Sequence, residues 1–275
     1  MTRRSTRILI VASVALAASA CSGGGGTTAA APSVTRSTGS PTAVVPTTVE
    51  PSGTPAPPAG SLAPVTGAYA PRIDPAVFGT TVDNPFFPLR PGMRRDYRSK
   101  TKDGLETTAV TVTTRTRTLM GVTCVEVRDT VRLDGKLVED TFDWYAQDSA
   151  GNVWYFGEDT KEYENGKVSS TMGSWQAGVH GAQPGIIMPA QPRVGDRYRQ
   201  EFYKGQAEDM AQVLSVTEHA TVPIGSYTGM VMTKETTPLE PDVLERKYYA
   251  RGVGEVLTVD VTAGNVRDEL VRFTV

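Results

Sequence analysis

The stretch "DTFDWYAQDSAGNVWYFGEDTKEYENG", residues 140–166, decides the fold of this chain. Two runs rich in aromatic and β-branched residues flank "DSAG" at 148–151, and a second turn signal, "NG", follows at 165–166. Short runs of this kind, separated by Asp, Asn and Gly, are typical of antiparallel β-hairpins. We therefore predict that two long strands pair within this stretch.

The same pattern continues on both sides of the hairpin. Further turn signals stand at 102–104, 134–135 and 264–265, each between runs rich in Val, Thr and Tyr. We find no segment of ten or more residues with a convincing 3.6-residue apolar period, which a surface helix would show. The sequence predicts an all-β domain.

Two parts of the domain repeat each other. The matched segments are "PGMRRDYR" (91–98) with "PRVGDRYR" (192–199) and "DWYAQ" (143–147) with "KYYAR" (247–251). We interpret these as two tandem copies of one antiparallel strand meander, about 88–168 and about 189–275. Two such half-sheets can pair their edges, so we predict a closed or partly open barrel, with a β-sandwich as the alternative.

The N-terminus carries an export signal. Three arginines precede the apolar run "ILIVASVALAASA" (8–20), which has the length of a signal-peptide core and is short for a membrane span. Small residues lead directly to Cys21, as in bacterial lipoproteins. We predict a signal peptide over 1–20 and lipidation, such as palmitate, at Cys21; the alternative is an ordinary secretory cleavage site.

A linker follows the lipidated cysteine. Residues 21–70 consist mainly of Gly, Ala, Ser, Thr and Pro, which cannot bury enough apolar area to fold. Residues 71–275 form the predicted β-domain. We expect an exported protein anchored by lipid to the outer face of the cell membrane, or a secreted one if Cys21 carries no lipid.

The charge and cysteine content restrict the partners. Residues 71–275 contain 24 lysines and arginines against 29 aspartates and glutamates, without a basic cluster, so we expect no nucleic-acid partner. Cys124 lies in a strand-like run, where a lone cysteine is usually a small packing residue. His180 and His219 have no partners at metal-ligand spacing, so we expect neither a metal nor a cofactor.

The 140–166 hairpin also holds the candidate binding residues. A four-residue turn at 148–151 would place Trp144 and Tyr155 on a core face. The opposite face would then carry the aromatic and acidic side chains Asp143, Tyr145, Trp154, Phe156 and Glu158. Such a face suits a sugar or polar ligand, or is a cross-strand aromatic pair that stabilises an exposed sheet.

A long apolar segment connects the two repeats. Within 171–192, the large apolar residues Trp175, Ile186, Ile187 and Met188 would form an exposed patch if they stood in water. We expect them to cap one end of the barrel or to line its mouth, as a candidate lid.

Two motifs point to a family. The segments "DWYAQDSAGNVWYFGEDT" and "PGIIMPA", together with "NPFFPLRPG" (84–92), resemble an uncharacterised family of secreted bacterial proteins and lipoproteins. The resemblance implies export but supplies no activity, so no catalytic residue follows from it.

Three functions remain compatible with these features. No nucleophile, zinc or Cys/His motif occurs, so we expect a protein that is not an enzyme. The first hypothesis is a membrane-anchored envelope lipoprotein with a non-catalytic binding or structural domain, which contacts an envelope protein, glycan or lipid ligand. The second is a carrier of an apolar ligand inside the barrel. The third is a carbohydrate-active hydrolase that uses the Asp143 and Glu158 carboxylates.

Overall fold

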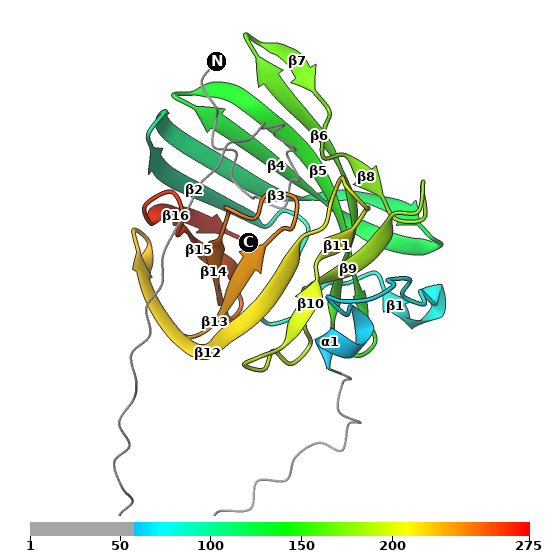
Figure 1. The fold of residues 1–275 in the computed structure, drawn as a ribbon. Helices are drawn as coiled ribbons and strands as arrows, with labels where there is room; N and C mark the ends of the chain where they lie inside the picture. The colour runs from blue at the N-terminus through cyan, green and yellow to red at the C-terminus, as the bar shows by residue number, and fades with distance from the viewer. Residues whose placement is uncertain (1–57) are drawn as a thin grey trace, which may run out of the picture. The chain divides into compact units, whose positions relative to one another are not determined.

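The computed structural model describes residues 58–275 of the chain (Figure 1). The expected signal peptide, Cys21 and most of the expected linker lie outside these residues. Within them, the helices are α1 (Ala59–Leu62) and the 3-10 turn η1 (Pro75–Val77), and none is long and apolar enough to cross a membrane. Strands make up most of the rest, which confirms the all-β prediction.

The first half of the domain is a meander of five long strands, each antiparallel to the next. These are β2 (Arg94–Thr101), β3 (Gly104–Leu119), β4 (Val122–Leu133), β5 (Lys136–Asp148) and β6 (Val153–Glu164). Tight turns join them: Asp134 and Gly135 both have positive φ, 47° and 80°, as a two-residue hairpin turn requires. The turn dipeptides read in the sequence therefore mark real strand ends.

The second half is a similar meander. Its strands are β12 (Met210–Val222), β13 (Gly225–Thr236), β14 (Glu245–Ala250), β15 (Gly254–Asp260) and β16 (Val266–Thr274). Strand β16 pairs with β2, so the two meanders form one continuous sheet. The short strands are β1 (Phe78–Gly79), β7 (Lys167–Ser170), β8 (Trp175–Gln176), β9 (Gln183–Met188), β10 (Arg197–Arg199) and β11 (Glu201–Phe202).

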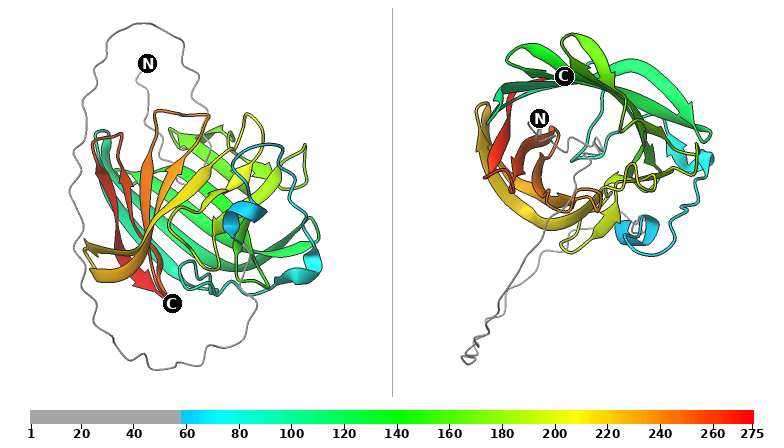
Figure 2. Two further views of the ribbon diagram at one scale, coloured as in Figure 1. Left: turned by 60° about the horizontal axis from the view of Figure 1, so that its bottom comes forward. Right: turned by 45° about the horizontal axis from the view of Figure 1, so that its top comes forward.

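The sheet curls into a barrel that is almost closed. In the end-on view its strands form a ring (Figure 2). The order of strands runs from β10 through both meanders to β9 and β11, which leaves one unsealed seam between β10 and the β9–β11 edge. The partly open barrel is confirmed, and the sandwich alternative is wrong because one sheet supplies all the long strands.

A strap of residues 58–69, which begins with α1, crosses this seam. Arg199 of β10 donates from its backbone N to the Ala63 carbonyl at 2.9 Å, and its guanidinium donates to the Pro64 and Val65 carbonyls at 3.0 and 3.2 Å. On the other side, the Tyr69 hydroxyl donates to the Pro184 carbonyl in β9 at 2.6 Å. The sequence assigned these residues to the linker, whereas the structure packs them against the barrel.

Apolar side chains fill much of the barrel. The segment 82–92 enters it, held by a β-bridge between Val82 and Leu89, and both of these side chains are buried. Cys124 is fully buried as well, and burial raises the pKa of its thiol to about 12, so it is a packing residue and not a reactive thiol.

The register of the 140–166 hairpin differs from the expected one. Its turn has three residues, because the backbone N of Asp148 donates to the Asn152 carbonyl, and Gln147 stands opposite Val153. A β-bulge at Phe156 then shifts the pairing again, so that Tyr145 stands opposite Tyr155 and Asp143 opposite Glu158. The expected face of five residues is therefore wrong.

Gly157 makes the bulge possible. Its φ is 132°, and a Cβ at this position would overlap the Trp175 carbonyl oxygen in β8. Only glycine combines this backbone angle with so close an approach of a neighbouring strand.

Candidate functional site

A cavity of about 80 Å³ lies inside the barrel, and both meanders line it. Six charged side chains contribute to its wall: Arg95, Asp129, Asp143, Lys247, Glu255 and Asp268. Four aromatic side chains contribute as well: Phe87, Tyr97, Tyr145 and Tyr249. They come from β2, β4, β5, β14, β15, β16 and the segment 82–92, so the cavity is formed by the barrel as a whole and not by one hairpin.

The aromatic rings connect the two halves. Phe87 lies between Tyr145 of β5 and Tyr249 of β14, with ring centroids 5.3 and 6.4 Å apart. Tyr145 also stacks on Tyr155 of β6 at 4.9 Å. These contacts fix the orientation of the Tyr145 ring, which makes it a rigid part of the wall.

Asp143 projects into the cavity beside these rings. The Tyr155 hydroxyl donates to its Oδ1 at 2.7 Å. Burial raises the pKa of this carboxyl to about 7, and the nearby Glu139 carboxyl adds to the shift while the Tyr155 hydrogen bond opposes it. Asp143 therefore changes its protonation near neutral pH.

Asp129 of β4 is the second carboxyl of this half. It is only 5% exposed, and its Oδ1 has no hydrogen-bond partner among residues 58–275. Burial raises its pKa well above the ordinary range, and the charges of Glu139 and Asp143 raise it further. A buried carboxyl oxygen without a hydrogen-bond partner lowers the stability of the fold by about 1–3 kcal/mol. The Asp129 Oδ1 would therefore gain from a ligand that donates a hydrogen bond to it.

In the second half, Lys247 of β14 occupies the position that the sequence match aligns with Asp143. Its Nζ lies 3.0 Å from Glu235 and 3.9 Å from Glu245, all three nearly fully buried. Burial alone would lower the pKa of this ammonium, but the carboxylates around it, Glu235 first, more than offset that effect and raise it. The Tyr249 hydroxyl donates to Glu235 at 3.1 Å and completes the cluster.

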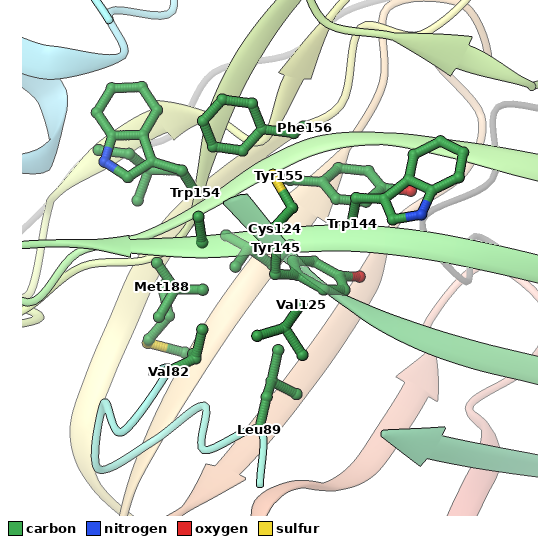
Figure 3. Packing of buried hydrophobic residues seen from close by; sticks show 14 of the residues in the cluster. Val82, Leu89, Cys124, Val125, Trp144, Tyr145, Trp154, Tyr155, Phe156 and Met188 are labelled. Carbon is green, nitrogen blue, oxygen red and sulfur yellow. The ribbon is translucent and has the colours of Figure 1, made fainter. Parts of the chain in front are cut away.

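The structure divides the five candidate binding residues. Asp143 and Tyr145 line the cavity, and Glu158 is buried opposite Asp143 across the β5–β6 pair. Trp154 and Phe156 are buried in the same hydrophobic cluster as Tyr145 and Tyr155 (Figure 3), but they do not line the cavity. The bulge at Phe156 is the cause, because it breaks the alternation on which the expected face depended.

Trp154 and Phe156 pack against strand β1. Both meet the Phe78 ring of β1 edge-on, with centroids 6.3 and 5.6 Å apart. The Trp154 Nε1 donates to Asp148 at 2.9 Å, which ties the indole to the hairpin turn. Trp144 is also assigned differently from the expected core face shared with Tyr155: it is buried beneath the Arg117 guanidinium, 4.1 Å from its ring.

The residues of the expected lid, Trp175, Ile186, Ile187 and Met188, are all buried. Ile186 and Met188 pair with β6 as part of β9, so they form the barrel wall next to the seam. The Trp175 Nε1 donates to Glu201 at 2.8 Å, which fixes the indole in the interior.

Asp129, Arg95 and Tyr249 were absent from the sequence-based candidates. Each stands beside other polar or aromatic residues of its strand, and the sequence does not show which face of a barrel strand is the inner one. The match of "DWYAQ" to "KYYAR" was the available signal, because it aligns Tyr145 with Tyr249 and Asp143 with Lys247. Within residues 58–275, no three His, Cys, Asp or Glu side chains converge as a metal ion requires.

Two solved structures are similar to the chain. One is an exported protein of Bacteroides fragilis with a YmcC-like fold, 16% identical, with a TM-score of 0.41 over 69% of this chain and 99% of that one. The other is described as a lipoprotein of Parabacteroides distasonis, 14% identical, with a TM-score of 0.39 over 69% of this chain and 98% of that one. No family profile and no curated protein matches the chain. Because both TM-scores are below 0.5, the likeness assigns neither a family nor an activity.

Proposed function

We propose that this chain is a membrane-anchored lipoprotein of the cell envelope whose β-barrel binds, without catalysis, the end of a small polar ligand. The observation that carries the proposal is Asp129, a buried carboxyl with a partnerless oxygen in the wall of a cavity. Buried polar groups are nearly always hydrogen-bonded, and the Asp129 Oδ1 is one of the buried atoms without a partner in residues 58–275 that belongs to a side chain of the cavity wall. A ligand that donates to it removes the cost.

The anchoring part of the proposal rests on the sequence. The apolar run that precedes Cys21 and the small residues beside it support export and lipidation. The segment that follows Cys21 would hold the barrel near the membrane, where an envelope glycan or protein presents polar groups.

The carrier alternative is less well supported by the cavity. Sites for drug-sized apolar ligands have about 300–1,000 Å³ and mainly hydrophobic walls. Here the volume is about 80 Å³ and six charged side chains stand in the wall. The hydrolase alternative needs two carboxyls at one substrate, but Glu158 does not line the cavity that Asp143 lines.

A cavity-filling variant tests the proposal. Saturation-transfer NMR on the full-length protein in detergent, with empty micelles as the blank, measures binding of propylammonium, propanol, propionate and glucose. We expect at least one probe to bind, and Val110→Phe in the cavity wall to weaken it by about tenfold or more. Val168→Phe, at an exposed position of β7, is the matched control. Binding that survives Val110→Phe unchanged, or no binding by any probe, would refute the proposal.

A further inference from the structure

Resting on the function proposed above, we infer that the group bound in the cavity is an organic ammonium, held by the Asp129 and Asp143 carboxylates beside the aromatic rings. Four carboxyl side chains line the cavity against two cationic ones. Both cations already have partners: Arg95 donates to the Val253 carbonyl at 2.9 Å, and Lys247 pairs with Glu235. Both cations are thus held by groups other than Asp129 and Asp143.

The second half of the barrel shows how this interior holds an ammonium. Lys247 places its Nζ 3.0 and 3.9 Å from two buried carboxylates, and a tyrosine hydroxyl donates to the nearer one. The first half also has buried carboxyls, Asp129 and Asp143, and a tyrosine hydroxyl that donates to one of them, from Tyr155 to Asp143, although these groups stand at other strand positions. What differs is the cation, because Asp143 itself stands where the sequence match places Lys247.

Among residues 58–275, no lysine or arginine takes the place of that missing lysine in an ion pair. None of the ion pairs formed within residues 58–275 includes Asp129 or Asp143. An ammonium that enters the cavity would donate to the free Oδ1 of Asp129 and pair with Asp143. Burial favours the neutral form of both carboxyls, and an ammonium offsets this because it supplies the counter-charge of the ionised form. An anion or a neutral hydroxyl supplies no such counter-charge.

The aromatic wall favours the same group. The ring centroids of Phe87 and Tyr145 lie 5.3 Å apart in the cavity wall. Tyr97 and Tyr249 are the other aromatic residues of this wall. Ring faces attract ammonium groups, and more strongly where water is displaced. A cavity of about 80 Å³ takes only a few non-hydrogen atoms, so the ligand would be a longer molecule that inserts one aminoalkyl end.

The probes described above separate this inference from the proposed function. We expect propylammonium to bind the full-length protein, and the equally long propanol and propionate to bind at least about tenfold more weakly. Asp129→Asn and Asp143→Asn should each weaken propylammonium binding by about tenfold, because each removes a charge and keeps the shape. Glu164→Gln, an exposed residue of β6, is the matched control.

Each outcome gives a decision. If propanol, propionate or glucose binds in preference to propylammonium and Val110→Phe abolishes that binding, the ammonium inference is wrong and the proposed function stands. If no probe binds, both are wrong. If propylammonium binds equally well to both asparagine variants, with native circular dichroism, the two carboxyls do not hold it. Should a variant fail to fold, the preference among the probes at the unaltered protein decides.

Discussion

The β5–β6 hairpin and the β13–β14 pair each place a tyrosine hydroxyl on a buried carboxyl, but only the β13–β14 pair adds a lysine to it. In β13–β14, Tyr249 donates to Glu235 and Lys247 pairs with the same carboxylate. In β5–β6, Tyr155 donates to Asp143, and no lysine or arginine of the described chain forms an ion pair with that carboxyl. The contrast is that the carboxyl of one cluster has a cationic partner within the chain, while Asp143 has none among the described residues.

The β5–β6 and β14–β15 hairpins share a local distortion. The register shifts between Trp144 and Tyr145 in β5–β6, and between Tyr248 and Tyr249 in β14–β15, positions that the sequence match aligns. The tandem repeat stays a prediction, but a bulge at the same place in both halves gives Tyr145 and Tyr249 equivalent settings. The difference in charge thus stands on a similar backbone.

The largest expected effect comes from removing the second half's cation. Lys247→Met leaves the Glu235 and Glu245 carboxyls buried without their counter-ion, so we expect a loss of about 3–5 kcal/mol in the free energy of unfolding. Chemical denaturation followed by fluorescence measures it. Asp143→Asn should cost far less, since Asp143 has no ion pair to break. Equal losses of stability in Lys247→Met and Asp143→Asn would contradict the conclusion that only the second half contains a buried ion pair.

The pH dependence of stability is a second, smaller contrast. The pKa of Asp143 is about 7 in the folded protein and near 4 in the unfolded chain, so the folded state holds a proton that the unfolded chain releases. Its contribution is complete below pH 4, falls as the pH rises to about 7, and is constant above that. Asp143→Asn should therefore reduce the pH-dependent loss of stability in this range, by up to about 1.4 kcal/mol per pH unit.

Several titratable groups interact with the Asp143 carboxyl. The denaturation experiments are run at the same salt concentration, and the pH dependence that they give is interpreted together with the titration of these groups. They are Asp129 of β4, Glu139 and Tyr145 of β5, Tyr155 and Glu158 of β6, and Glu201 of β11. Parallel stability curves for the unaltered protein and Asp143→Asn between pH 4 and 7 would contradict the assignment. The exposed variant Glu164→Gln serves as the control.

The smallest expected effect concerns Trp154, which packs against Phe78 and does not line the cavity. Trp154→Phe removes the Nε1 hydrogen bond to Asp148 and keeps most of the ring packing against Phe78. We expect a loss of about 1 kcal/mol in stability and unchanged propylammonium binding. Denaturation and saturation-transfer NMR on one preparation measure both. A tenfold loss of propylammonium binding in this variant would show that Trp154 belongs to the binding site.

The sequence allowed the strands, the tight turns and the barrel to be predicted, because alternation and turn dipeptides are local signals. The binding face could not be predicted in the same way. A three-residue turn replaced the expected four-residue one, and Phe156 bulged, so two local shifts redistributed Tyr155 and Trp154. The interior charges were also hidden, since charged residues in a strand are normally expected to face water, whereas Asp129 and Lys247 face inward.

The strap across the seam has a mechanical consequence. Residues 58–69 are the part of the described chain nearest in sequence to Cys21, and Arg199 binds three successive carbonyls of this strap, those of Ala63, Pro64 and Val65. If the lipid holds the N-terminal side, a pull on the domain reaches these bonds before any strand of the two meanders. Tension would break the hydrogen bonds between the strap and Arg199 first, while the long strands stay paired.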